Sequence, residues 1–301
     1  MGEGLRGTWF VAPTAFADDG SLDVGSQRRL VEAALGWGVD GVTAMGVTSE
    51  PATLSPDERE AALRAVFESA RSLPVVVGCS GPNAEAVVEL VGQALGLGAA
   101  AAMVSAPPGL QDLDGLPSFF AQVAREGELP LVLQDEPVAT GVVLPVGVMV
   151  ACLETSGTRT VKLEDPPTPS KIAALLAADP GLSVFGGLGG SAALGELRHG
   201  ARGTMTGFAF PEILRGVREA VEANDPGRAE ELFERFLPLI RFEAQPRIGL
   251  AIRKELLRRR GALASARTRV GEPLSPGTMA ELDQVLARVG IRPSPEALAV
   301  E

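Results

Sequence analysis

A short buried strand is predicted in the segment Arg159-Thr160-Val161-Lys162-Leu163-Glu164-Asp165-Pro166-Pro167. Its first half carries β-branched residues, and the two prolines end it. Side chains two positions apart on a strand point to the same face, so we expect Lys162 and Glu164 to face the same way. A helical pattern follows at residues 169–177. The segment therefore reads as the first half of a strand-then-helix unit.

This unit recurs along most of the chain. Short apolar runs that alternate with helical patterns are typical of a parallel sheet buried on both faces. Eight such units in about 215 residues fit a (β/α)8 TIM barrel, an α/β fold. A doubly wound open sheet would need a glycine-rich fingerprint after its first strand, and Thr14-Ala15-Phe16-Ala17-Asp18 is not one. The expected strands are residues 8–13, 41–45, 74–79, 100–105, 130–134, 158–164, 182–185 and 201–205.

The strand pattern stops at Asn224-Asp225-Pro226-Gly227. Three amphipathic helices are predicted beyond it, at residues 228–237, 247–260 and 278–289. We therefore divide the chain into a barrel at residues 1–223 and a C-terminal helical segment at residues 224–301 that packs on the barrel.

Composition excludes several classes of function. The net charge of −11 and the pI of about 4.8 argue against a nucleic-acid partner, because a phosphate backbone requires a basic surface. The start, Met1 to Arg6, lacks the features of a signal peptide, and no apolar run could span a bilayer. Cys79 and Cys152 lack CxxC spacing, which suits buried thiols in a reducing compartment. We expect a cytoplasmic protein whose partner is a small molecule, with no membrane contact.

Metal and cofactor sites are also not expected. The single histidine, His199, ends a helical pattern before Gly200, where a histidine is usually a helix cap. One histidine and two cysteines make a zinc or similar metal site improbable. The sequence contains no motif for an organic cofactor, and we expect none.

Lysine is scarce, which makes each lysine informative. Of 27 basic residues, 24 are arginine, and only Lys162, Lys171 and Lys254 are lysine. Lys171 and Lys254 lie in helical patterns and are expected to be solvated, as is the run Arg258-Arg259-Arg260. Lys162 lies on a buried strand, where it can either pair with Glu164 or act as a nucleophilic amine. The segment alone does not decide between these two.

A barrel places its functional groups at the C-terminal ends of its strands. The loop Gly46–Pro51 there offers backbone N–H groups and two hydroxyls, which suit a carboxylate, although it could be a simple turn. The run Gly186–Gly190 could hold a phosphate or make a tight turn. Gly187, in this run, is a candidate substrate-binding residue.

Several motifs together resemble the dihydrodipicolinate synthase / N-acetylneuraminate lyase family of class I aldolases. The resemblance covers nearly the whole chain. It rests on Gly7-Thr8 to Pro13, Gly20-Ser21-Leu22-Asp23, Gly38-Val39-Asp40-Gly41, Gly46-Val47-Thr48-Ser49-Glu50, Leu54-Ser55-Pro56-Asp57-Glu58-Arg59, Pro130-Leu131-Val132-Leu133, Pro137, Thr140-Gly141, Val161-Lys162 and Gly200-Ala201-Arg202-Gly203.

The resemblance implies a (β/α)8 barrel, usually a homotetramer, that binds pyruvate or another 2-oxo acid as a Schiff base. Lys162 matches the Schiff-base lysine. Thr48 and Ser49 match the loop that holds the carboxylate of the 2-oxo acid. Met205 matches a residue of the eighth strand whose backbone lines the pocket.

The sequence also departs from the family pattern, and it has no tyrosine at all. Gln134 stands where the family has its proton-shuttling tyrosine. A second tyrosine, which reaches the neighbouring subunit's site, is replaced around Pro107-Pro108. Val47 replaces a hydroxyl residue, and Ala139 replaces the arginine that binds the second substrate of dihydrodipicolinate synthases.

Because the tyrosine relay is missing, synthesis of dihydrodipicolinate is not expected, and another group must move protons. Glu164, on the same face as Lys162, is the first candidate. Asp135, Glu136 and a water held by Gln134 are others. We name Lys162, Gln134 and Glu164 as the catalytic residues.

The leading hypothesis is a lyase, either an aldolase or a dehydratase, that forms a Schiff base with pyruvate or a 3-deoxy-2-oxo sugar acid. The second hypothesis is a related protein with little or no turnover that binds a 2-oxo acid. A phosphate-binding barrel enzyme without Schiff-base chemistry is the third. The protein is expected to be a homo-oligomer, either a tetramer or a dimer.

Overall fold

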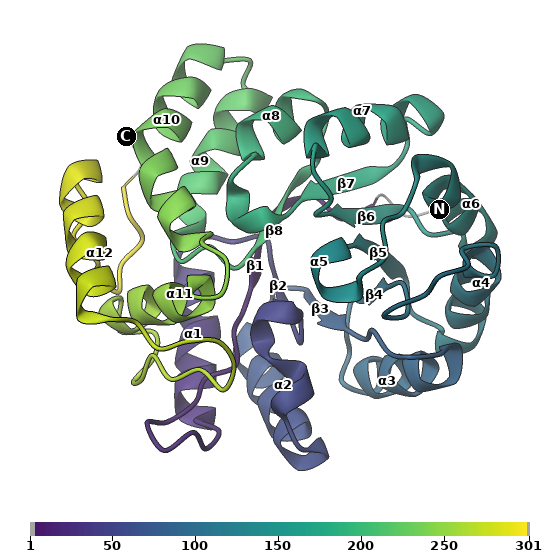
Figure 1. The fold of residues 1–301 in the computed structure, drawn as a ribbon, viewed down its shortest axis with the longest axis horizontal. Helices are drawn as coiled ribbons and strands as arrows, with labels where there is room; N and C mark the ends of the chain where they lie inside the picture. The colour runs from purple at the N-terminus through teal and green to yellow at the C-terminus, as the bar shows by residue number, and fades with distance from the viewer. Residues whose placement is uncertain (1–3, 300–301) are drawn as a thin grey trace.

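Eight parallel strands close into a barrel in which each strand pairs with the next and β1 pairs with β8 (Figure 1). This computed structural model describes residues 4–299. Residues 1–3 and 300–301 lie outside the described residues. They are the first residues of the expected barrel segment and the last of the expected C-terminal segment, and residues 1–3 belong to the stretch that was tested for a signal peptide. The strands are β1 Gly7–Val11, β2 Gly41–Ala44, β3 Val75–Gly78, β4 Ala101–Ser105, β5 Leu131–Asp135, β6 Thr160–Leu163, β7 Ser183–Gly186 and β8 Gly203–Thr206.

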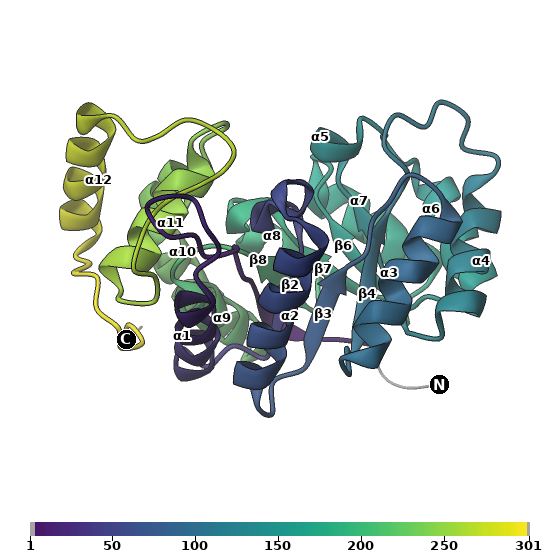
Figure 2. The same cartoon turned by 90° about the horizontal axis from the view of Figure 1, so that it is seen from below.

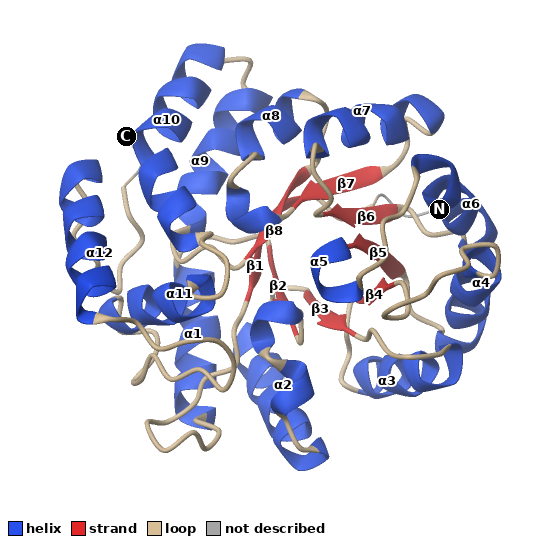
Figure 3. Cartoon of the chain, in the orientation of Figure 1, coloured by secondary structure: helices blue, strands red, loops and turns tan. Residues whose placement is uncertain are grey.

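Helices surround the strands on the outside, which confirms the predicted TIM barrel (Figure 3). Each crossover contains one main helix, which is only six residues long in α8, and short helical turns lie in the loops after β2, β5 and β7. The helices of the barrel are α1 Val24–Gly36, η1 Val47–Ser49, η2 Pro51–Thr53, α2 Pro56–Ala70, α3 Ala84–Gly96, α4 Leu116–Gly127, α5 Pro137–Thr140, α6 Val146–Ser156, α7 Thr168–Ala178, η3 Leu188–Gly190, α8 Ala193–Arg198 and α9 Pro211–Glu222.

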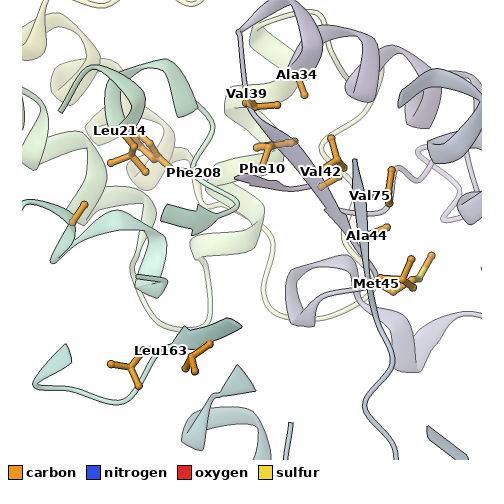
Figure 4. Close-up of a cluster of buried hydrophobic side chains, with 14 of the residues drawn as sticks. Phe10, Ala34, Val39, Val42, Ala44, Met45, Val75, Leu163, Phe208 and Leu214 are labelled. Carbon is orange, nitrogen blue, oxygen red and sulfur yellow. The ribbon is translucent and has the colours of Figure 1, made fainter. Parts of the chain in front are cut away.

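Alternation along the strands separates two cores. Outward residues such as Phe10, Val42 and Leu163 pack against the helices in one large cluster (Figure 4). Inward residues form a smaller cluster that fills the barrel, so the barrel is a packed core rather than a pore. The members of this inner cluster are Trp9, Val11, Val76, Ala101, Met103, Val132, Phe185 and Met205.

The C-terminal helices α10 Pro226–Glu243, α11 Gly249–Arg259 and α12 Pro276–Val289 lie together on one side of the barrel (Figure 2). α10 continues past the expected end at residue 237, although Pro238 cannot donate a backbone hydrogen bond. Leu239 and Ile240, just beyond the proline, are fully buried, and their packing offsets the lost bond. No helix of the described part of the chain is long and apolar enough to cross a membrane.

Three predictions of surface charge are wrong. Lys254 is fully buried and pairs with Glu50 at 2.5 Å, because α11 packs against the loop after β2. Arg260 is buried against Glu212 on α9. Lys171 is largely covered and bridges Asp135 and Asp165 at 2.5 and 2.8 Å.

The seam between β1 and β8 leaves no room for a side chain at Gly203. A Cβ there would overlap the backbone of Gly7. We therefore expect Gly203→Ala to lower the free energy of unfolding by about 3 kcal/mol, through overpacking of backbone that cannot move away. Gly92→Ala, on α3 with open space around it, is the control and should stabilise by up to about 1 kcal/mol. Urea unfolding measures both; equal stability of the two variants would contradict the expectation.

Candidate active site

Lys162 projects into the barrel from β6. In the register of the sheet it lies opposite Gln134 on β5 and Phe185 on β7. Its neighbours Val161 and Leu163 point outward into the helix-facing core. Only 5% of Lys162 is exposed, so its amine lies in a setting with little water.

Glu164 lies against this amine, as the spacing of two residues predicts. Its Oε2 is 2.9 Å from Lys162 Nζ and accepts a hydrogen bond from Gln134 Nε2 at 2.8 Å. The N–H of Leu188 donates to its other oxygen at 3.4 Å. One carboxylate oxygen therefore contacts both of the other predicted catalytic residues. The structure brings Lys162, Gln134 and Glu164 into one contact group.

Glycines of the β7 loop make room for carboxylates rather than for a phosphate. A Cβ at Gly187 would overlap Glu164, and a Cβ at Gly186 would overlap Glu196. An anionic ligand in this loop would therefore meet two carboxyl groups. This arrangement disfavours the phosphate-binding hypothesis, and it explains the two adjacent glycines by close approach.

Glu196, on α8, is the second of these carboxyl groups and was not singled out by the sequence. It is fully buried; Oε1 accepts a hydrogen bond from the Thr168 hydroxyl at 2.6 Å, and Oε2 has no partner among the described residues. The pKa of Glu196 is raised to about 7, chiefly by burial; the hydrogen bond from Thr168 opposes this rise and the charge of Glu164 contributes to it. Glu196 is therefore mostly neutral below pH 7.

The loop after β2 holds its two hydroxyl residues differently. Ser49 is buried and its hydroxyl donates to the carbonyl of Ala12 at 2.7 Å. The oxygen of the Thr48 hydroxyl is buried and has no partner among the described residues. Thr48 is therefore the better placed of the two to bind a ligand, and the role of Ser49 stays a prediction.

A cavity of about 440 Å³ opens at the C-terminal end of the barrel between this loop and β5. Residues from each region in which the sequence departs from the family pattern line it: Val47, Gln134, Ala139 and, of the pair Pro107-Pro108, Pro108. These positions are thus gathered around one cavity. Gln134 both lines the cavity and donates a hydrogen bond to Glu164, so it connects the cavity to the Lys162–Glu164 pair.

Two serines and a glutamate supply polar groups to this cavity. Ser80 Oγ accepts hydrogen bonds from both the N–H and the hydroxyl of Ser105, at 3.0 and 2.9 Å, which leaves the proton of Ser80 free for a ligand. Burial raises the pKa of Glu136 to about 7, the hydrogen bond from the Ala139 N–H opposes this, and the charge of Glu164 adds to it. No feature of the sequence marked either serine.

Asp135 and Met205 are placed by strand alternation. Asp135 follows the inward-pointing Gln134, so its side chain points outward and pairs with Lys171. It therefore does not face Lys162 as a proton-transfer group, a role that the sequence had left open. Met205 is fully buried in the inner core beneath the site. Its proposed contact with substrate through the backbone stays a prediction, as does that of Gly187.

Comparison with known proteins gives a consistent result over the whole chain. The profile of the Dihydrodipicolinate synthetase family matches residues 5–290. An L-2-keto-3-deoxyarabonate dehydratase of Azospirillum brasilense is 33% identical and covers 94% of both chains. A 4-hydroxy-tetrahydrodipicolinate synthase of Xanthomonas axonopodis pv. citri is 36% identical over 75% of this chain and 78% of its own. The crystal structure of a dihydrodipicolinate synthase from Rhodopseudomonas palustris superposes with a TM-score of 0.89 at 34% identity, covering 94% and 97% of the two chains.

The buried carboxyl of Glu196 predicts a pH-dependent stability. A raised pKa means that the protonated side chain stabilises the fold; this contribution is complete below about pH 4.5 and is lost as the pH rises through about 7. Glu196→Gln cannot ionise, so relative to wild type it should gain about 3 kcal/mol between pH 5 and pH 8.5. Urea unfolding across this range measures the difference. A difference in the free energy of unfolding that stays constant from pH 5 to pH 8.5 would refute the prediction. Glu154→Gln, at an exposed position, serves as the control.

Proposed function

The chain belongs to the dihydrodipicolinate synthetase family and is a class I lyase, and on that premise we propose that it dehydrates a 3-deoxy-2-oxo sugar acid bound as a Schiff base on Lys162. The observation that carries this proposal is the contact of one Glu164 oxygen with both Lys162 and Gln134. It supplies a proton acceptor and donor where the tyrosine relay is missing. Similarity to the L-2-keto-3-deoxyarabonate dehydratase over 94% of both chains supports the choice of substrate class.

Glu164 is proposed to move the protons of Schiff-base formation. Lys162 attacks the C2 carbonyl only as a neutral amine, so its proton passes to Glu164 Oε2, 2.9 Å away. The carbinolamine then loses its hydroxyl as water, for which Glu164 returns a proton. Gln134 holds the carboxylate in place through its amide. The iminium that results withdraws electrons from C3.

Dehydration then requires a base at C3 and an acid at the C4 hydroxyl. Glu164, a carboxylate again once it has returned its proton, is proposed to take the C3 proton, which gives an enamine. The nitrogen lone pair then restores the C=N bond as the C3=C4 bond forms and the C4–O bond breaks, and the hydroxyl leaves as water. Glu136, on the wall of the cavity, can donate this proton while its carboxyl is neutral. An aldol cleavage would need a base at the same hydroxyl, so a neutral Glu136 favours dehydration.

The cavity is proposed to hold the hydroxylated tail of the substrate. The hydroxyls of Ser80 and Ser105 can bind such a tail, and Ala139 supplies no cation for a second carboxylate. At the other end, Thr48 with Ser49 is proposed to bind the C1 carboxylate, with Gly187 and Met205 lining the site. We further propose a cytoplasmic homo-oligomer, a tetramer or dimer as the family resemblance implies.

Reductive trapping tests the proposed nucleophile. Pyruvate and borohydride should give a covalent adduct that peptide mass spectrometry maps to Lys162, and Lys162→Arg should give none, because a guanidinium cannot lose its proton. No adduct with any 2-oxo acid would refute the proposal. An adduct without turnover of any 3-deoxy-2-oxo sugar acid would favour the second hypothesis, a 2-oxo acid binder.

Glu164→Gln separates binding from proton transfer. The amide keeps the shape of the side chain but cannot take a proton, so we expect turnover to fall by about 10²-fold or more. The reduced adduct should still form, although more slowly, at long incubation. Steady-state kinetics and trapping time courses measure the two effects, and full turnover would remove Glu164 from the mechanism.

Glu136→Gln tests the proposed acid by its pH dependence. In the wild type, kcat should fall as the pH rises through about 7, because Glu136 then loses the proton that it donates. The variant should be slower by about 10²-fold at pH 6 and should lack this limb of the profile. A variant profile that keeps the wild-type limb would contradict the role of Glu136.

A further inference from the structure

The C-terminal segment makes a buried contact with the loop that is proposed to bind the substrate carboxylate. Glu50 ends this loop in the left-handed region, with φ of 55°, which is unusual for a residue with a side chain. Only 3% of Glu50 is exposed. A strained and buried glutamate of this kind must be held in place by its surroundings.

Within residues 4–299, the hydrogen-bond donors to the Glu50 carboxylate come from the C-terminal segment. Lys254 Nζ contacts Oε1 at 2.5 Å, and the N–H groups of Arg269 and Val270 donate to Oε2 at 2.6 and 2.9 Å. Lys254 also donates to the carbonyl of Arg267 at 2.9 Å and lies over the ring of Phe16. The ammonium therefore joins the loop to the segment 267–270.

The rest of the loop is fixed on its other side. The Ser49 hydroxyl donates to Ala12, and the Thr14 hydroxyl donates to the carbonyl of Ser49 at 2.5 Å, both just beyond β1. Thr48 comes directly before Ser49, and its hydroxyl oxygen is buried without a partner among the described residues. The short turn that carries Thr48 is thus held at Ser49 by residues that follow β1 and at Glu50 by Lys254.

The segment also contributes directly to the cavity. Val270, whose N–H binds Glu50, lines the cavity and is 43% exposed there. Arg269 pairs with Glu58 at the start of α2 and donates to the carbonyl of Thr53 at 2.8 Å. A shift of residues 267–270 would therefore move the loop and the cavity wall together.

We propose that Lys254 is a positioning residue of the active site, which sets the affinity for the carboxylate end of the 2-oxo acid by holding Glu50 and hence Thr48. The proposal rests on the proposed function, since it takes the loop as the site of carboxylate binding. It assigns to the C-terminal helices a part in substrate binding, beyond their packing on the barrel.

Lys254→Met keeps most of the length of the side chain and removes its charge. We expect the pyruvate concentration for half-maximal borohydride trapping, and the KM for the sugar acid, to rise about tenfold or more. The kcat should change little, and the adduct should still map to Lys162. This division between KM and kcat distinguishes positioning from a general loss of structure.

Arg260→Met is the matched control. Like Lys254→Met, it removes the cation of a buried ion pair between the C-terminal segment and the barrel, here the pair with Glu212. The partners of Arg260 in the described part of the chain do not include the loop after β2. Arg260→Met should lower the midpoint of thermal unfolding and leave half-saturation unchanged. The double variant Glu50→Gln/Lys254→Met, which leaves no buried charge unpaired, should fold if Lys254→Met does not, and it should still show the raised half-saturation.

The proposal would be overturned if a folded Lys254→Met or Glu50→Gln/Lys254→Met variant needed only the wild-type pyruvate concentration for half-maximal trapping. A loss of kcat at unchanged half-saturation, or an equal rise in Arg260→Met, would also overturn it. Failure of the proposed function gives a different result, because the wild-type protein would then form no adduct at all.

Discussion

An amine enclosed in the barrel needs an anion beside it, and the rest of the site follows from that constraint. Lys162 can exist at 5% exposure because Glu164, two residues further along and directly after the end of β6, faces the same way and contacts its amine. The β5–β6 register then puts Gln134 beside the pair, where its amide binds the same carboxylate oxygen. The missing side chain at Gly187 gives the glutamate the space it occupies. Two residues on β5 and β6 and two residues in the loops that follow β6 and β7 thus depend on one another.

The two ends of the site differ in how far they follow the family pattern. The end that would receive the 2-oxo group keeps Lys162 and Thr48. The other end, the cavity, is lined by residues from each region in which a family residue is replaced: Val47, Pro108, Gln134 and Ala139. Chemistry common to the family is therefore combined here with a recognition surface of different shape and charge. A fold of this type permits such a change because strands carry the reacting groups and loops carry the selectivity.

Strand periodicity was enough to predict the fold and the facing of Lys162 and Glu164, because alternation fixes which side chains share a face. The same alternation, applied one residue beyond Gln134, would have directed Asp135 outward, and this signal was available. The predicted surface positions of Lys254 and Arg260 were wrong for another reason. A helical pattern shows which face is apolar, but it does not show that a charged residue meets a buried carboxylate some 50 to 200 positions away. Ser80 and Ser105 carried no pattern, since each is polar only within a cavity made by distant strands.

The buried ion pairs between the barrel and the C-terminal helices have a consequence for the order in which the chain can complete its fold. Glu50 and Glu212 belong to the part of the chain synthesised first, whereas Lys254 and Arg260 are added near its end. Until those cations leave the ribosome, the nascent barrel contains two carboxylates at positions that will later exclude water. The loop after β2 and the start of α9 therefore cannot make their final ion-pair contacts until the last helices have been synthesised.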